Sequence, residues 1–275
     1  MAFGAAVFDI DGTLALMDKA TASYAALPGA AEALAECRAQ GLPAVAYTNG
    51  TFFPPAHYYP KLAAAGLVLE PGHILTPAAV AAQALARMGH ARVMVMGAEG
   101  TTQPLRDAGI EVIAPEPGAP RVDAVLLGWC PDFTAAQLEC VVQAVWDGAK
   151  PFAGSVAPFF AGAGGKRLMG ISGAMAAAVT HATGQAVTLF GKPEVTGLQI
   201  VSAITGAQPD QMLVIGDDPT LEILMGRRAG AFTLGVTSGI VGPEGFAAMP
   251  EDQRAHLVRP SLVGFSLREL EGMRA

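Results

Sequence analysis

Two aspartates, Asp9 and Asp11, stand where the apolar run Ala5–Phe8 ends, two positions apart. Side chains with this spacing on an extended chain point to the same side. Because the run before them is typical of a buried strand, their charges need a partner such as a metal ion. Gly12 allows a sharp turn, and Thr13 adds a hydroxyl. One carboxylate of such a pair can attack phosphorus while the other moves a proton. The alternative is a strand end followed by a solvated Asp-Gly turn.

Two other polar motifs follow apolar runs in the same way. Tyr47-Thr48-Asn49-Gly50 comes after the run 43–46 and offers a hydroxyl and turn N–H groups that suit a phosphate oxygen. Asp217 and Asp218 come after the run 212–215 and form a second acid pair that suits a hard cation. Each motif has a purely structural alternative. The first is then an ordinary Asx turn, and the second is an N-cap of the helix that Pro219 opens.

Lys192 adds a cation to these groups. It directly precedes Pro193, which favours the first position of a helix, so the sequence predicts that Lys192 lies near the positive end of that helix. A lysine there is mildly unfavourable unless an anion is near. The position therefore favours a lysine that faces a phosphate over one that is solvated.

Strand-like and helix-like segments alternate along the chain and would position these motifs. Several strand candidates are continuous apolar runs, as expected for strands buried on both faces. The candidates are Ala5–Asp9, Pro43–Tyr47, Arg92–Met96, Val122–Leu127, Met212–Ile215 and Phe232–Gly235. Helices are predicted near 29–40, 55–65, 77–88, 99–108, 134–146, 172–182, 194–205 and 219–229, most of them followed by a glycine that suits a helix C-cap. The alternation predicts an α/β fold with a mostly parallel sheet, at whose carboxyl ends the motifs gather.

Length and composition narrow the classes of protein. A chain of 275 residues can bury a large core, as one big domain or two modest ones. No apolar run approaches the ~18 residues that span a bilayer, and the apolar N-terminus lacks the basic region of a signal peptide. The net charge is −7 without a basic stripe, which argues against nucleic-acid binding. The three cysteines have no paired spacing, so we expect a reduced, cytoplasmic protein.

The motifs in this order resemble the haloacid dehalogenase superfamily of phosphohydrolases. They are Asp9-x-Asp11-Gly12-Thr13, Thr48-Asn49-Gly50, Gly191-Lys192-Pro193 and Gly216-Asp217-Asp218. The first is specific, and the others gain weight from their order and spacing. About 140 residues separate the second motif from the lysine, as in the branch with a large α/β cap inserted there. The resemblance implies a Rossmann-like, doubly wound parallel sheet in residues 1–76 and 187–275. It also implies an inserted α/β cap in residues 77–186 that determines substrate specificity.

The resemblance also implies a role for each matching residue. Asp9 would be the nucleophile and form an aspartyl-phosphate, and Asp11 would protonate the leaving alkoxide and then activate water. Groups that hold the phosphate would come from Thr48, Asn49, Gly50 and Lys192. Magnesium would be bound by Asp9, the backbone carbonyl of Asp11, and Asp217.

Three departures from the family pattern limit this transfer. The fourth motif usually carries an aspartate where this chain has Glu222, so Asp218 or Glu222 would be the remaining acid, in the outer shell. The extra methylene of glutamate would alter that outer shell or the metal preference. The cap reads Gly154–Pro158 where the branch often has an Asn-Pro-Asp-like stretch, so substrate identity is not carried over. The segment Ala15–Leu27 is longer than usual and would reshape the entrance.

The leading interpretation is a magnesium-dependent phosphatase for a small phosphorylated metabolite, such as a sugar phosphate, a nucleotide monophosphate or phosphoglycolate. Another enzyme of the superfamily is one alternative. Asp11 disfavours a dehalogenase, because a dehalogenase has no leaving alkoxide to protonate. The large cap disfavours a mutase. A non-catalytic phosphometabolite-binding or scaffolding protein is the other, suggested by Glu222 and the altered cap loop. Family relatives lead us to expect a homodimer formed through the cap, and neither nucleic acid nor membrane as a partner.

Overall fold

The computed structural model describes residues 2–18, 23–161 and 167–274. The chain forms two units. Unit 1 contains Met1–Thr48, Ala56–Leu75 and Lys192–Ala275, and unit 2 contains Asn49–Pro55 and Thr76–Gly191. The core ranges expected from the sequence differ from unit 1 by residues 49–55, 76 and 187–191, which group with unit 2.

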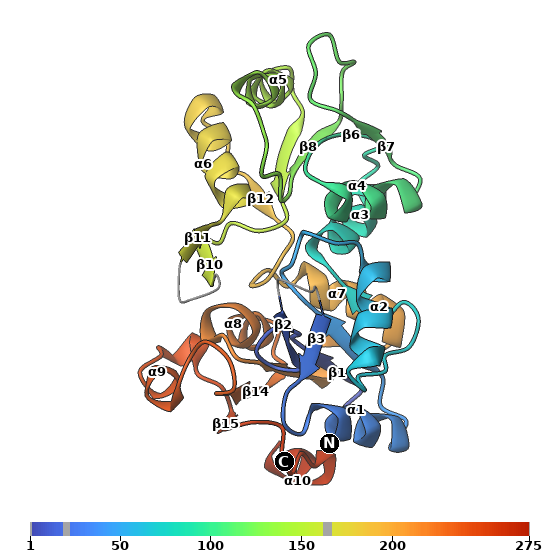
Figure 1. The fold of residues 1–275 in the computed structure, drawn as a ribbon, viewed down its shortest axis with the longest axis vertical. Helices are drawn as coiled ribbons and strands as arrows, with labels where there is room; N and C mark the ends of the chain where they lie inside the picture. The colour runs from blue at the N-terminus through green and yellow to red at the C-terminus, as the bar shows by residue number, and fades with distance from the viewer. Residues whose placement is uncertain (1, 19–22, 162–166, 275) are drawn as a thin grey trace. The chain divides into compact units, whose positions relative to one another are not determined.

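A parallel sheet of six strands forms the centre of unit 1, in the order β15-β14-β13-β1-β4-β5. Figure 1 labels β1, β14 and β15 of this sheet. Its middle strands are buried along their whole length, which explains their continuous apolar sequences. The strands are β1 (Ala5–Phe8), β4 (Ala44–Tyr47), β5 (Ile74–Leu75), β13 (Met212–Gly216), β14 (Phe232–Val236) and β15 (Leu257–Arg259).

Helices join and cover the strands of unit 1. They are α1 (Ala30–Ala39), α2 (Pro55–Ala64), α7 (Thr196–Thr205), α8 (Leu224–Arg228), α9 (Pro243–Ala247) and α10 (Leu267–Met273), with α2 beginning at the last residue of the loop that groups with unit 2. Short helical turns lie at Pro209–Gln211, Pro219–Ile223 and Glu251–Gln253. Glu36 of α1 accepts a hydrogen bond from the backbone N of Leu267, which ties α1 to the start of α10.

The long segment after the first acid pair forms an antiparallel hairpin. Strand β2 (Ala15–Asp18) pairs with β3 (Ser23–Ala26), and the pairing begins directly after the turn at Gly12, whose N–H donates to the backbone O of Ala15. Tyr24 of the hairpin is buried and packs against Tyr58 of α2, with ring centroids 6.2 Å apart. The hairpin was not expected from the sequence.

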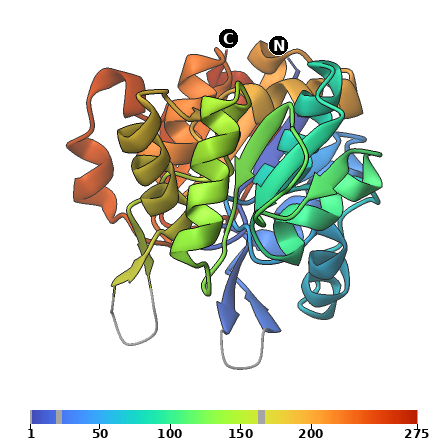
Figure 2. The same ribbon diagram turned by 90° about the horizontal axis from the view of Figure 1, so that it is seen from above.

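Unit 2 has its own parallel sheet, in the order β12-β9-β8-β6-β7. Its strands are β6 (Arg92–Met96), β7 (Glu111–Ile113), β8 (Ala124–Leu127), β9 (Lys150–Ala153) and β12 (Thr188–Leu189). Helices α5 (Ala135–Trp146) and α6 (Ile171–Thr183) lie on one side of this sheet, and α3 (Pro77–Arg87) and α4 (Glu99–Asp107) lie on the other (Figure 2). A separate antiparallel pair consists of β10 (Phe159–Ala161) and β11 (Arg167–Met169).

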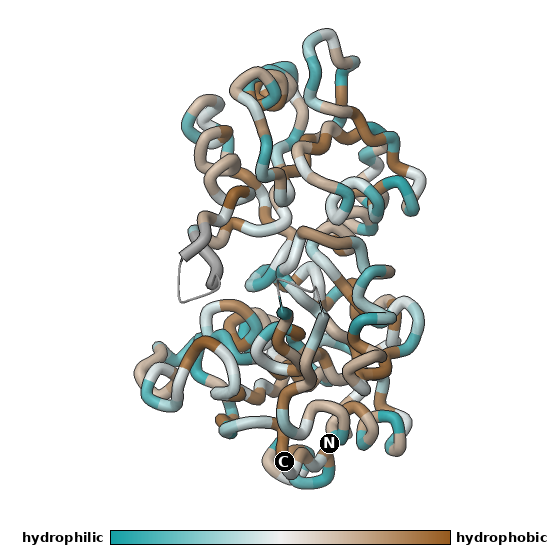
Figure 3. The backbone as a smooth tube through the Cα atoms, viewed as in Figure 1, coloured by the Kyte–Doolittle hydropathy of each residue, from teal (hydrophilic) through white to brown (hydrophobic). Residues whose placement is uncertain are grey.

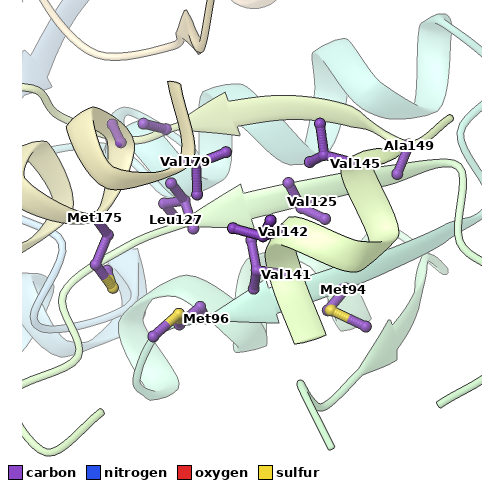
Figure 4. Close-up of a cluster of buried hydrophobic side chains, with 12 residues drawn as sticks. Met94, Met96, Val125, Leu127, Val141, Val142, Val145, Ala149, Met175 and Val179 are labelled. Carbon is purple, nitrogen blue, oxygen red and sulfur yellow. The ribbon is translucent and has the colours of Figure 1, made fainter. Parts of the chain in front are cut away.

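Aliphatic side chains and methionines fill the space between this sheet and helices α5 and α6. Met94, Val125, Leu127, Val141 and Val179 belong to this buried cluster, which Figure 4 shows in close-up. The same strands form brown, hydrophobic stretches of the backbone in Figure 3. Unit 2 therefore has a hydrophobic core of its own.

The loop 49–55 lies along the carboxyl ends of the unit 2 strands. At the start of the loop, Asn49 contacts Gly191 after β12, and Thr51 contacts Gly154 after β9. Further along, Phe52 contacts Trp129 after β8. Phe53 contacts Gly100 in α4, the helix that follows β6. A Cβ atom at Gly191 or Gly100 would overlap the chain beside it. The loop thus follows the order of four neighbouring strands and is fitted against glycines at their ends.

The predicted fold class is confirmed: the protein is an α/β chain with parallel sheets and a large inserted α/β region. All six strands expected from the sequence are present, with ends that differ by at most two residues. In the described part of the chain, no helix is long and apolar enough to cross a bilayer. Cys37, Cys130 and Cys140 are free, as expected.

Candidate active site

Three neighbouring strands of unit 1 bring the polar motifs to one edge of the sheet. Phe8 at the end of β1 pairs with Ala46 of β4 on one side and with Ile215 of β13 on the other. The residues that follow these strands therefore emerge together at their carboxyl ends. They are Asp9 and Asp11 after β1, Thr48 after β4, and Asp217 and Asp218 after β13.

Lys192 links the ends of these strands. Its Nζ donates to Asp9 Oδ1 at 2.5 Å and to the backbone O of Tyr47 at 2.9 Å, and it forms an ion pair with Glu222 Oε1 at 2.5 Å. Nζ also lies 5.5 Å from the centre of the Tyr47 ring. The side chain of Lys192 is 1% exposed. A buried ammonium with two carboxylate partners is well compensated, so Lys192 is held in one place.

Glu222 occupies the interior of the site. Besides the ion pair with Lys192, its Oε2 accepts a hydrogen bond from the backbone N of Asp218 at 3.1 Å. The helical turn Pro219–Ile223 is wider than an α-helical turn and directs this side chain toward the strand end, where Gly216 lies directly beneath it. Glu222 is therefore a buried residue that contacts the lysine directly.

Asp217 is held by a backbone hydrogen bond from the segment after β14. It is buried, and its Oδ2 accepts a hydrogen bond from the backbone N of Ile240 at 2.9 Å. A Cβ atom at Gly12 would lie only 2.5 Å from Oδ2, so the turn after the first acid pair passes directly beside this carboxylate. Asp218, in contrast, accepts hydrogen bonds from the backbone N and hydroxyl of Thr220. The capping alternative thus applies to Asp218 alone.

The two aspartates of the first motif differ in environment. Asp9 is 6% exposed, whereas Asp11 is exposed to solvent. Burial raises the pKa of Asp9 to about 7, although Lys192 opposes the shift and the charge of Asp217 adds to it. A buried carboxylate beside an ammonium is suited to act as a nucleophile, and an exposed carboxylate can exchange protons with solvent.

The buried charges of the site do not balance. Asp9, Asp217 and Glu222 are acids with a raised pKa, for which burial is the largest cause, and Lys192 supplies one positive charge against them. Burial lowers the pKa of Lys192, but the nearby carboxylates outweigh it, so that its pKa lies above the ordinary value. When all four groups are ionised, three carboxylates and one ammonium leave two negative charges, which is the charge that a divalent cation would neutralise.

The oxygen donors also fit a hard cation. Among the described residues, no three His, Cys, Asp or Glu side chains converge as a ready-made ligand cluster. The set expected from the sequence does not need one, because it consists of two carboxylates, from Asp9 and Asp217, and one backbone carbonyl, from Asp11. All of these donors are oxygens, the ligands that Mg²⁺ prefers.

The phosphate-binding motif has two different environments. Thr48 is buried, and its backbone N donates to Leu75 O of β5 at 3.1 Å. The Lys192 bond to the neighbouring Tyr47 carbonyl brings the lysine to the same strand end. Asn49 and Gly50 are half-buried and belong to the loop of unit 2, where the Asn49 side chain packs against Gly191.

Two predicted helices beside the site are present but begin differently from the prediction. The helix after Lys192 begins at Thr196 rather than at Pro193, because the first helical N–H groups, those of Leu198 and Gln199, bond to the carbonyl of Val195. Lys192 is thus held by its ion pairs in a turn and does not lie at a helix start. The predicted helix 219–229 is divided into the wide turn that carries Glu222 and the short helix α8.

Sequence reasoning missed two contributors to the site. They are the backbone carbonyl of Tyr47, which accepts from Lys192, and the backbone N–H of Ile240, which donates to Asp217. Backbone groups leave no signature in residue type, so no pattern in the sequence could have indicated them. Thr13, whose hydroxyl had been noted beside the acids, is buried, and its Oγ1 has no hydrogen-bond partner among the described residues.

Comparisons with known proteins indicate the family of this chain. A family model described as haloacid dehalogenase-like hydrolase matches residues 6–111, and a second, described as HAD-hydrolase-like, matches residues 189–269. Chronophin from Rattus norvegicus is 35% identical over 153 residues, which are 54% of this chain and 48% of that protein. The chain therefore spans about half the length of the chronophins that it matches.

Other relatives match over more of their length. An acid sugar phosphatase from Staphylococcus epidermidis is 26% identical over 239 residues, 86% of this chain and 88% of that protein. The structure of a glycerol phosphate phosphatase from Mycobacterium tuberculosis, solved in complex with magnesium, has the same fold, with a TM-score of 0.82 at 24% identity over 98% of this chain and 76% of that one. The two family models together cover more than half of the sequence, including every residue described at the strand ends. The chain belongs to the haloacid dehalogenase-like hydrolases.

Proposed function

We propose that the protein is a magnesium-dependent phosphatase that hydrolyses a small phosphorylated metabolite through an aspartyl-phosphate on Asp9. The observation that carries this proposal is Lys192, a buried ammonium that contacts the carboxylate of Asp9 and the end of β4 at the same time. Such a charge is placed to stabilise a phosphoryl group that is attached to Asp9 and lies beside Thr48.

Asp9 is the nucleophile in this proposal. The Lys192 bond engages Oδ1, and Oδ2 is the atom that we expect to attack phosphorus. A P–O bond to Asp9 forms while the P–O bond to the substrate's alcohol breaks, and the leaving oxygen carries the developing negative charge. Burial beside Lys192 supports this role, because the interaction of the lysine with negative oxygens is stronger in a site with little water.

Asp11 moves the proton in both halves of the reaction. Its side chain gives a proton to the leaving alkoxide in the first half. In the second half it takes a proton from the water that attacks phosphorus, so that the bond to Asp9 breaks and inorganic phosphate leaves. The solvent exposure of Asp11 supports this role, because the residue has to regain its original protonation state after each turnover.

The remaining polar groups would hold the phosphate. Thr48 would contribute its hydroxyl, and Asn49 and Gly50 would contribute backbone N–H groups. Lys192 would offset the charge of the phosphoryl oxygens. Their common location after β4 supports this assignment.

Magnesium would be held by the Asp9 and Asp217 carboxylates and the Asp11 carbonyl. When bound, the cation supplies positive charge that polarises the phosphoryl group and balances the buried acids. We assign Glu222 as the remaining acid of the fourth motif. Its role would be to hold Lys192 rather than to bind the metal. The excess of buried negative charge supports a divalent ion at this place.

Relatives suggest the class of substrate. The names acid sugar phosphatase and dihydroxyacetone phosphatase belong to proteins that match this chain over most of their length. We therefore propose a small sugar or polyol phosphate, with unit 2 as the cap that determines which one is accepted. The altered stretch Gly154–Pro158 leads us to expect a substrate preference different from that of the relatives.

A phosphate-ester screen tests the proposal. Purified protein is assayed for phosphate release from p-nitrophenyl phosphate and a panel of sugar, polyol and nucleotide phosphates with MgCl₂. We expect turnover that Asp9→Asn abolishes and that Asp252→Asn, at an exposed position, leaves unchanged. Lack of turnover by the wild type across the panel would favour a binding protein. Full activity of Asp9→Asn would exclude the covalent mechanism, and full activity in EDTA would exclude the role of magnesium.

A further inference from the structure

The segment Ser238–Ile240, after β14, connects the two loops that carry the acids of the site. The hydroxyl of Ser238 donates to the backbone O of Gly12 at 2.8 Å, and the backbone N of Ile240 donates to Asp217 Oδ2 at 2.9 Å. Gly239 lies between these two bonds, and a Cβ atom there would overlap the Asp217 carboxylate. We call Ser238–Ile240 the strap. It contacts the first and the last acid motif with one short piece of chain.

The hydrogen bond from Ser238 helps to hold the turn at Gly12 in one conformation. Gly12 has a φ of +99°, a conformation that side chains other than glycine rarely adopt. Its N–H donates to Ala15 O, which sets the plane of the Asp11–Gly12 peptide, and its carbonyl accepts from Ser238, which sets the plane of the next peptide. With both planes fixed, the direction of the Asp11 carbonyl is fixed as well.

We propose that Ser238 is a positioning residue for the divalent-cation site, acting through the turn at Gly12. The inference rests on the cation of the proposed function. The strap holds two of the three oxygen donors assigned to the cation: the Asp11 carbonyl through Ser238 and Gly12, and the Asp217 carboxylate through Ile240. Ser238 itself is neutral, and its hydroxyl donates to a backbone carbonyl, so its contribution is the spacing between the donors rather than charge.

Removing the hydroxyl should weaken cation binding more than it disturbs the fold. In Ser238→Ala the Gly12 carbonyl loses one neutral hydrogen bond, for which the usual value corresponds to about a fivefold change in an equilibrium constant. Ser238→Thr keeps a hydroxyl at the same place and should remain within about twofold of the wild type. Ser202 offers a matched control, because its hydroxyl also donates to a backbone carbonyl of unit 1, that of Leu198 in α7, at 3.1 Å.

The test measures magnesium binding without relying on turnover. Wild type, Ser238→Ala, Ser238→Thr and Ser202→Ala are titrated with MgCl₂ in a calorimeter, and the rise of Tm with MgCl₂ is recorded in parallel. We expect Ser238→Ala to bind magnesium about fivefold more weakly, with Ser238→Thr and Ser202→Ala close to wild type. With p-nitrophenyl phosphate, the magnesium concentration for half-maximal rate should rise by the same factor, while kcat at saturating magnesium stays within about twofold.

Each outcome decides between a positioning and a purely structural role. If Ser238→Ala lowers the Tm but binds magnesium as the wild type does, Ser238 only stabilises the fold and the inference is wrong. If the wild type gives no magnesium signal in either measurement, the cation site is absent and the inference fails with it. If magnesium binds with the expected fivefold difference but no phosphate ester is hydrolysed, the inference holds and the proposed function fails.

Discussion

Replacement of Glu222 by glutamine tests whether the buried ion pair keeps Lys192 in place. Glu222 Oε1 lies 2.5 Å from Lys192 Nζ, and Oε2 accepts from the backbone N of Asp218 at 3.1 Å. Glutamine has a single carbonyl oxygen, so it can serve one of these donors and must turn its NH₂ group toward the other. Glu222→Gln thus removes one charge and leaves one buried donor without its acceptor.

The expected loss follows from these contacts. An unsatisfied buried donor costs ~1–3 kcal/mol, and loss of one partner of a buried ion pair costs ~3–5 kcal/mol. Lys192 keeps Asp9 as a partner, and the removal of one carboxylate reduces the repulsion that Glu222 exerts on Asp217. We therefore expect a net loss of ~2–3 kcal/mol in the free energy of unfolding of the metal-free protein, close to the lower end of these ranges.

Two assays report this loss. For a chain of this length ~1 kcal/mol shifts the Tm by about 2–4 °C, so the Tm of Glu222→Gln in EDTA should fall by about 5–10 °C. If the same free energy is lost from the transition state, kcat/KM for p-nitrophenyl phosphate falls by roughly 30- to 150-fold. Glu222→Asp keeps the charge on a shorter side chain and should lie between the wild type and Glu222→Gln in both assays.

A matched substitution provides the control. Glu194 forms an exposed ion pair with Arg228 at 3.5 Å, and exposed pairs contribute ~0–1 kcal/mol. Glu194→Gln should therefore change Tm by no more than about 4 °C and leave kcat/KM unchanged. If Glu222→Gln behaves like Glu194→Gln in both assays, the buried pair does not hold Lys192, and our reasoning about the fourth motif is refuted.

Three other predictions concern pH, leaving groups and packing. Because burial raises the pKa of Asp9 to about 7 in the folded protein, the folded state binds the proton more tightly than the unfolded state. The Tm in EDTA should therefore fall as pH rises from 5 to 8, and MgCl₂ should reverse this fall. A Tm that rises over this pH range would contradict the raised pKa of Asp9. Asp11→Asn should reduce kcat for alkyl phosphates much more than for p-nitrophenyl phosphate, whose leaving group needs no proton, and equal losses for both substrates would argue against a general acid. Gly197→Ala would bring a methyl group into the ring of Tyr47 and should lower the free energy of unfolding in urea by ~1–3 kcal/mol. Gly272→Ala, with open space around it, should not lower this free energy. Similar values for the two variants would contradict the close packing of Gly197 against Tyr47.

The sequence was most informative where a buried strand ends in charge. Continuous apolar runs before Asp9, Thr48 and Asp217 indicated parallel strands, and parallel strands place their following residues at one edge. The strands that were not expected, such as β5 and β12, have only two residues each and carry no detectable period. Their positions depend on pairing with neighbours, which a single sequence does not reveal.

The details of the site depended on contacts between distant residues. The sequence left Asp218 and Glu222 as equal candidates for the fourth motif, because both are acids close to Asp217. The wide turn after Pro219 separates them: Asp218 caps this turn, and Glu222 faces Lys192. The helix start expected at Pro193 was wrong for a related reason, since the local preference of proline for a helix start was outweighed by the contacts that hold Lys192 in a turn.

The loop fitted along the unit 2 strand ends matters for recombining this protein with its relatives. Residues 49–55 are distant in sequence from 76–191, yet their contacts are with Gly100, Gly154 and Gly191. A chimera that exchanges only 76–191 would pair a foreign sheet with a native loop, and a side chain in the donor at the position of Gly100 would collide with the loop backbone at Phe52 and Phe53. The exchangeable module is therefore a split one, and a successful graft has to carry both segments from the same parent.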